Sequence, residues 1–285
     1  MKLTAITDEI SQDFDHALTV LQEYGVQSAE LRGLWDVNIV DLSKDQVEKA
    51  KRILDDKGMS VCCIASPLFK CDLWETSAEA TGPTHLAKER SIADQMALLN
   101  HCAELAHFFG TKLIRVFSFW RRGELTKEIE DRIIQELGNA AESAQRLGVI
   151  LALENEHSCF LGTGEEVARV IKAVGSPALQ AVWDPGNSFC AGEIPYPNGY
   201  EAIKPYIVHI HVKDAVKLNG KPKFVVMGTG EIDYSGQFKA LKDDNYKGYI
   251  SLETHYRPAS GSAEEGSREC LEYLKRVVAD FCGGS

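Results

Sequence analysis

Several features that mark common protein classes are missing from this sequence. Its eight cysteines include no Cys-x-x-Cys pair, so neither a zinc finger nor a disulfide-stapled scaffold is expected, and most thiols should be buried. No stretch approaches the roughly 20 apolar residues that a membrane-spanning helix needs. No Gly-x-Gly-x-x-Gly follows the first predicted strand, which removes the usual dinucleotide-binding motif of an open, doubly wound sheet.

Positive charge is also scarce. The chain has 31 Lys and Arg against 42 Asp and Glu, a net charge of −11. Nucleic-acid affinity depends largely on Lys and Arg that neutralise phosphates, so a nucleic-acid partner is not expected. The first residues, Met1 to Glu9, reach acidic side chains before an apolar signal segment could form. We therefore expect a cytoplasmic protein that binds no membrane.

Strand and helix patterns alternate through about eight units without a polar linker. Predicted strands cover 3–7, 28–31, 60–65, 112–117, 149–154, 179–184, 207–211 and 249–253. Predicted helices cover 14–24, 44–57, 84–109, 125–147, 165–174, 200–204, 235–244 and 264–281, with long loops over 66–83, a predicted lid, and 220–236. Five glycines separate a helical pattern from the next strand, as a left-handed helix cap requires: Gly25, Gly58, Gly110, Gly148 and Gly248. We predict one α/β domain over residues 1–285, a single (β/α)₈ TIM barrel.

Four of the later predicted strands finish with a side chain that can bind a metal: Glu154, Asp184, His211 and Glu253. In such a barrel the carboxyl ends of the strands meet at one rim, where the chemistry lies. Three carboxylates aimed at one centre repel each other, and a divalent cation relieves that repulsion. Oxygen ligands with a single imidazole suit Mn²⁺, Mg²⁺, Co²⁺ or Zn²⁺. The sequence therefore predicts one divalent metal site formed by these four residues.

Other polar side chains lie near the same strand ends. His209, His211 and Lys213 alternate along one strand and share a face. His211 is nearer the rim and is the predicted ligand, while His209 is expected to be hydrogen-bonded beneath it. Lys213 could hold a substrate oxyanion or lie at the surface, and Asn187 could bond a hydroxyl or only form a turn. The predicted substrate-binding residues are Asn187, Lys213, Glu156, Arg115, His209 and Trp35.

The motifs resemble those of the xylose-isomerase-like TIM barrels, the sugar phosphate isomerase/epimerase family. They are Val-Trp-Asp184-Pro-Gly-Asn187, His209-x-His211-x-Lys213-Asp214, Gly228-x-Gly230-Glu231-Ile232-Asp233, Gly248-Tyr-Ile-Ser-Leu-Glu253 and Leu-Ala-Leu-Glu154-Asn155. The resemblance covers nearly the whole chain. It implies that Glu154, Asp184, His211 and Glu253 bind Mn²⁺ or a similar ion, as in the ketose 3-epimerases of the group, and that the chain could form a homo-oligomer. Those epimerases carry a His where this sequence has Asn187.

These residues suit proton abstraction beside a carbonyl in a small carbohydrate or cyclitol. The metal would stabilise the enediolate while Glu154 and Glu253 remove a proton from one face and return it on the other. Return of the proton makes an isomerase or epimerase. Loss of a β-hydroxyl makes a dehydratase, as in the inosose and dehydroshikimate dehydratases of the superfamily. Two further alternatives are an endonuclease IV-like phosphodiesterase, which the charge and the incomplete histidine set disfavour, and a non-catalytic sugar-binding barrel.

Overall fold

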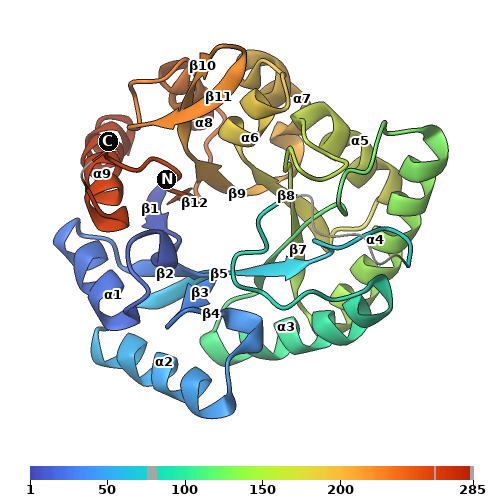
Figure 1. The fold of residues 1–285 in the computed structure, drawn as a ribbon, viewed down its shortest axis with the longest axis horizontal. Helices are drawn as coiled ribbons and strands as arrows, with labels where there is room; N and C mark the ends of the chain where they lie inside the picture. Colours follow the sequence, from blue (N-terminus) through green and yellow to red (C-terminus); the bar gives the residue numbers. More distant parts are fainter. Residues whose placement is uncertain (76–81, 260, 283–285) are drawn as a thin grey trace.

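Eight parallel strands form one sheet around a central axis (Figure 1). The structure, a computed structural model, describes residues 1–75, 82–259 and 261–282. The sheet order is β1 (Lys2–Ala5), β12 (Tyr249–Leu252), β9 (Ile207–Val212), β8 (Leu179–Trp183), β7 (Ile150–Glu154), β6 (Leu113–Val116), β5 (Ser60–Leu68) and β2 (Ser28–Leu31). A parallel bridge between Ile6 and Glu30 links β1 to β2, so the barrel is nearly closed. The predicted TIM barrel is confirmed.

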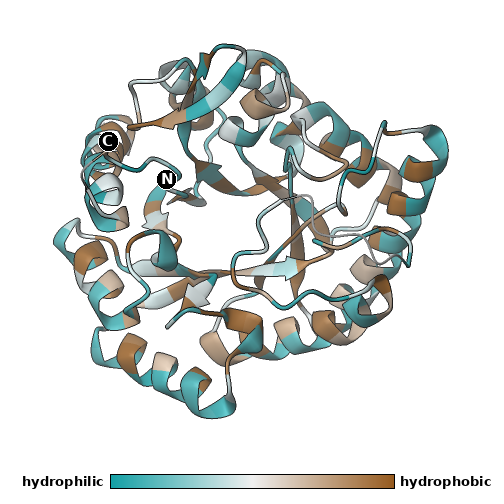
Figure 2. Cartoon of the chain, in the orientation of Figure 1, coloured by the Kyte–Doolittle hydropathy of each residue, from teal (hydrophilic) through white to brown (hydrophobic). Residues whose placement is uncertain are grey.

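Helices follow the strands and surround the barrel (Figure 1). The principal ones are α1 (Phe14–Glu23), α2 (Lys44–Asp56), α3 (Gln95–Phe109), α4 (Lys127–Leu147), α5 (Gly164–Val174), α8 (Tyr234–Asp243) and α9 (Ala263–Cys282), with the short α6 (Pro185–Cys190) and α7 (Tyr200–Ile203). Hydrophilic residues colour much of the outer surface of these helices (Figure 2). Among the described residues, no helix has the length and apolar composition that crossing a bilayer requires.

Local sequence signals account for most of the element boundaries. Ser43 and Gln46 form a capping box at the start of α2, which satisfies backbone N–H groups that the first helical turn leaves unpaired. Gly25, Gly58, Gly110 and Gly148 have positive φ, as predicted for left-handed caps. Gly248 does not take that role, because Asn245, with φ of 57°, supplies the left-handed residue after α8.

Two predicted segments are wrong in detail. The helix expected over 84–109 begins at Gln95, after a 3₁₀ turn at Ile92–Asp94. The loop expected over 220–236 begins inside a hairpin of β10 (Asp214–Leu218) and β11 (Lys221–Val225). Asn219 and Gly220 both have positive φ in its two-residue turn, so the Asn-Gly pair was the available signal. Of the predicted lid over 66–83, residues 76–81 lie outside the described part of the chain.

Candidate metal centre and active site

The four predicted metal-binding side chains meet at the carboxyl end of the barrel. Glu154 ends β7, Asp184 follows β8, His211 lies on β9 and Glu253 follows β12. One ligand atom from each lies within 4.8 Å of the others. None of the four residues is more than 3% exposed. Parallel strands aligned in register bring their ends to one rim, which is why side chains as far apart in sequence as Glu154 and Glu253 meet here.

Glu154 has one carboxylate oxygen that accepts no hydrogen bond from the described residues. Its Oε1 accepts a hydrogen bond from Asn187 Nδ2 (3.2 Å) and lies 3.1 Å from His211 Nδ1. Its Oε2 is buried and has no hydrogen-bond partner among the described residues. The guanidinium Nη1 of Arg115 is 3.4 Å from that oxygen. A buried carboxylate oxygen without a donor costs free energy, so Oε2 is a natural position for a metal or substrate contact.

The Lys213 ammonium lies between two of the other carboxylates. Its Nζ is 2.5 Å from Asp184 Oδ2 and also donates to Glu253 Oε2. Burial alone would lower the pKa of Lys213, but Asp184 and Glu253 hold it well above its ordinary value. Burial raises the pKa of Asp184, whereas Lys213 outweighs the burial of Glu253 and lowers the pKa of that carboxyl. The lysine therefore supplies the positive charge that this acidic cluster requires.

A close approach of two backbones permits this arrangement. Asp184 Oδ1 accepts a hydrogen bond from Asn187 N (2.9 Å) and caps α6. Gly186 lies in the first turn of that helix, and a Cβ there would be 2.5 Å from Lys213 Cγ and 2.9 Å from the Lys213 carbonyl oxygen. Glycine therefore leaves the room that lets the lysine reach Asp184.

Glu30 is a buried member of the site that the sequence analysis missed. Its Oε1 is 3.0 Å from His211 Nε2 and its Oε2 is 2.8 Å from His209 Nε2. Burial alone would lower the pKa of His211, but Glu30 and Glu154 raise it to about 10. Glu30 therefore fixes one ring nitrogen of His211 and leaves Nδ1 facing Glu154. His209 lies beneath the rim, fully buried against Glu30, which fits an interior residue better than a substrate contact.

Arg32 holds Glu253 from the side opposite Lys213. Its guanidinium donates to Glu253 Oε1 (2.9 Å), Glu9 Oε1 (2.6 Å) and both oxygens of Asp8. Asp8 and Glu9 follow β1, and Arg32 follows β2. This ion-pair network orients Glu253, and Asp8 and Glu9 also escaped prediction.

A row of polar contacts leads from the carboxylate cluster to a second lysine. Asn187 Oδ1 is 3.3 Å from His157 Nδ1, which is 3.1 Å from Glu156 Oε1. Glu156 Oε2 lies 3.7 Å from Lys70 Nζ. Asn187 and Glu156, both predicted substrate contacts, are thus joined to the cluster through side chains.

Two other predicted substrate contacts differ in their positions. Arg115 lies beside Glu154 and donates from Nη2 to the Ala65 carbonyl oxygen (3.1 Å), so it belongs to the site. Trp35 packs edge-on against Phe14 at 6.0 Å, with the Lys49 ammonium 4.5 Å from its ring centre. These contacts place Trp35 against α1 and α2, and the structure does not bring it to the cluster.

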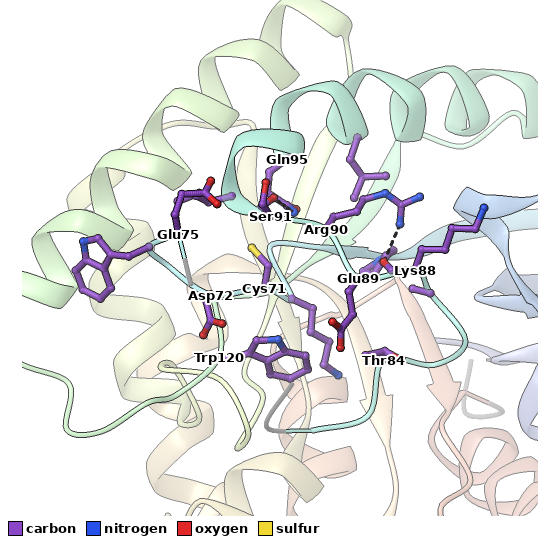
Figure 3. Close-up of a pocket in the computed structure, with 16 residues that line it drawn as sticks. Cys71, Asp72, Glu75, Thr84, Lys88, Glu89, Arg90, Ser91, Gln95 and Trp120 are labelled. Atoms are coloured by element: carbon purple, nitrogen blue, oxygen red, sulfur yellow. Dashed lines mark hydrogen bonds between the residues drawn. The ribbon is translucent and has the colours of Figure 1, made fainter. Parts of the chain in front are cut away.

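A cavity of about 190 Å³ lies beside Lys70. Trp120, Cys71 and Gln95 are among the residues that line it (Figure 3). Asp72, also on its wall, is paired with Arg122 at 2.7 Å.

The donor set fits a divalent cation. Three carboxylates and one imidazole nitrogen converge in a buried space. Glu154 Oε2 accepts no hydrogen bond from the described side chains. The Lys213 ammonium already lies beside Asp184 as a counter-cation. Hard oxygen ligands with a single imidazole suit Mn²⁺, Mg²⁺ or Zn²⁺.

Comparison with known proteins agrees with the barrel fold. Residues 18–277 match the family model described as xylose isomerase-like TIM barrel. An inosose dehydratase of Clostridium perfringens is 26% identical over 169 residues, 53% of this chain and 56% of the relative, so the match spans about half of that enzyme's length. The solved IOLI protein with a bound zinc atom gives a TM-score of 0.77 at 18% identity and 99% coverage of both chains. A solved L-ribulose 3-epimerase gives 0.72 at 16% identity, covering 99% of this chain and 96% of its own.

The fold and the rim of side chains thus define a TIM barrel with a candidate metal centre. The chain belongs to the xylose isomerase-like TIM barrel family. Its named relatives include enzymes that act on cyclitols and sugars, and structural neighbours bind zinc or magnesium.

Proposed function

We propose that this protein is a divalent-metal-dependent isomerase or epimerase that abstracts a proton next to the carbonyl of a small sugar, sugar phosphate or cyclitol. The observation that carries the proposal is the convergence of Glu154, Asp184, His211 and Glu253 in one buried cluster. One oxygen of Glu154 accepts no hydrogen bond from the described residues. A bound divalent ion, Mn²⁺ by preference, would act as a Lewis acid and stabilise negative charge that develops on the substrate oxygens.

Glu154 is the best-placed general base. Its Oε2 accepts no hydrogen bond from the described residues, although Arg115 Nη1 lies 3.4 Å away, while Asn187 holds Oε1. Glu253 faces the same centre and is held by Arg32. Two carboxylates on either side of a bound substrate can remove a proton from one face of a carbon and deliver it to the other, which inverts that carbon.

Neighbouring side chains would orient the substrate. Asn187, Lys213, Arg115 and Glu156 present amide, ammonium, guanidinium and carboxylate groups around the cluster. Hydroxyl and carbonyl oxygens of a sugar are suitable partners for such groups, and their burial keeps bulk water from the reacting carbon.

Dehydration is the second candidate, and the names of some sequence relatives support it. The inosose dehydratase of Clostridium perfringens is one of them. The same proton abstraction would occur at Glu154, followed by departure of a hydroxyl from the next carbon with a proton supplied by a nearby acid. Asn187 affects the choice between epimerisation and dehydration. Its amide does not transfer a proton, whereas a histidine at the same position could accept or donate one.

Incubation of the Mn²⁺-loaded protein with a panel of carbonyl sugars and cyclitols in D₂O tests the proposal. We expect deuterium at the carbon beside the carbonyl, without water loss for an isomerase or epimerase and with water loss for a dehydratase. Loss of a general base lowers rates by about 10²–10⁴-fold, so Glu154→Gln should lose exchange to that extent. Glu128→Gln, at an exposed position on α4, serves as the control. Absence of exchange across the panel in the wild-type protein would contradict the proposal.

A further inference from the structure

Two buried cations at the mouth of the barrel have donor groups without a hydrogen-bond partner among the described residues. Lys70 follows β5 and its side chain is 1% exposed. Among the described residues its ammonium has no hydrogen-bond partner, and the same is true of Arg115 Nε. Buried charged groups are almost always hydrogen-bonded, and each exception calls for a reason.

The two cations lie against the same aromatic ring. Lys70 Nζ is 4.3 Å and Arg115 Cζ 4.6 Å from the ring centre of Phe117. Trp120 is the second aromatic neighbour of Lys70, at 5.5 Å. The carboxylate facing Lys70 is that of Glu156, whose Oε2 is 3.7 Å away, beyond hydrogen-bond distance, while its Oε1 accepts from Ser158. Aromatic faces stabilise a cation but do not replace an anion.

Each of the two cations faces one carboxylate. Glu156 Oε2 lies 3.7 Å from Lys70 Nζ, and Glu154 Oε2 lies 3.4 Å from Arg115 Nη1. A divalent ion held by Glu154 would compete with Arg115 for that carboxylate.

A histidine at the same mouth responds to this positive charge. Burial, followed by the charges of Arg32 and Lys70, holds the pKa of His85 well below its ordinary value, and Arg115 acts in the same direction. Glu253 opposes these effects without reversing them.

We propose that the substrate carries an anionic group, a carboxylate or a phosphate, that binds between Lys70 and Arg115 beside Phe117 and Trp120. This inference rests on the proposed function, because it assigns the substrate class of that same site. The anion supplies the acceptors that Lys70 Nζ and Arg115 Nε lack. The reacting carbonyl of the same molecule then lies toward Glu154, the carboxylate next to Arg115. Neutral sugars and cyclitols leave both cations unsatisfied and bind less tightly.

The three probes share one carbon chain and differ in the group at its end. Binding of sorbitol, D-gluconate and sorbitol 6-phosphate to the Mn²⁺-loaded protein is measured by isothermal titration calorimetry at low salt. We expect at least one anion to bind about tenfold or more tightly than sorbitol, the gain that one charge-assisted hydrogen bond gives. The two anions separate a carboxylate from a phosphate site.

Substitutions test whether Lys70 causes the preference for an anion over sorbitol. Lys70→Met should reduce the preference for an anion over sorbitol to less than about twofold. Lys70→Arg should retain most of that preference, because guanidinium keeps the charge and the donors. Lys239→Met, at an exposed lysine of α8 paired with Asp243, should behave as wild type. The inference is overturned if neither anion is preferred over sorbitol, or if Lys70→Met keeps the preference.

The D₂O experiment distinguishes this inference from the proposed function. Deuterium exchange into a neutral cyclitol without any anion preference would retain the enolisation chemistry and reject the anionic substrate class. A Lys70-dependent anion preference without exchange into any substrate would retain the binding site and reject the chemistry.

Discussion

Replacement of Lys213 by methionine should make the fold strongly dependent on metal. The Lys213 ammonium is 2.5 Å from Asp184 and also contacts Glu253, and all three side chains are almost fully buried. Methionine fills similar space but leaves two buried carboxylates facing each other. Breaking a buried ion pair by removing one partner costs about 3–5 kcal/mol. For a chain of this size such a loss lowers the melting temperature by on the order of 10 °C.

Mn²⁺ should reverse this loss, because a divalent ion compensates the same carboxylates without having to displace an ammonium. At a free concentration near 1,000 times its dissociation constant, a ligand adds about 4 kcal/mol to the free energy of unfolding. Differential scanning calorimetry with EDTA and then with Mn²⁺ measures both effects. We expect a larger metal-induced rise in melting temperature for Lys213→Met than for wild type.

The exposed Lys239 on α8 again provides a matched control, since substitutions at such positions change stability by only about 0.5 kcal/mol. Equal melting temperatures for Lys213→Met and wild type in EDTA would refute the reasoning. So would a metal-induced rise that is no larger in the variant.

Three further predictions follow from contacts of the same cluster. Glu30→Gln should weaken Mn²⁺ binding about 10–100-fold, as loss of a partner behind a metal-binding imidazole does; unchanged affinity in calorimetry would exclude this role for Glu30. Burial lowers the pKa of His211, but Glu30 and Glu154 raise it from 6.5 to about 10. In metal-free protein, protonated His211 therefore stabilises the fold fully below pH 6.5, and this contribution is lost as the pH rises through 10. The urea-unfolding free energy should fall over that range, and His211→Gln should flatten the fall; parallel profiles would contradict the assignment. Gly186→Ala should destabilise the protein by about 1–3 kcal/mol, because its Cβ would lie 2.5 Å from Lys213 Cγ; a denaturation midpoint equal to that of wild type would show that the chain adjusts freely.

The strand ends were predictable because the barrel imposes a simple rule. Parallel strands of similar length bring their final residues to one rim, so an acid or histidine at each end is placed by topology alone. Glu154, Asp184, His211 and Glu253 follow this rule. Alternation along β9 likewise placed His209 beneath His211.

Residues whose role depends on distant partners were not predictable in this way. Glu30 lies in a short buried strand, and its partner His209 is 179 positions away. A charge within a buried strand was the one available signal. Lys70 lies in a loop, where no periodicity fixes the direction of a side chain, and its neighbour Glu156 is on another loop. Trp35 shows the opposite situation, since this aromatic near a strand end packs against helix α1.

Anomalous diffraction from crystals soaked in Mn²⁺ addresses the shared metal centre most directly. We predict a single manganese peak in contact with Glu154, Asp184, His211 and Glu253, accompanied by withdrawal of the Lys213 ammonium from Asp184. A map without a peak at the rim, or with manganese bound elsewhere while the Lys213 ion pairs persist, would contradict the account.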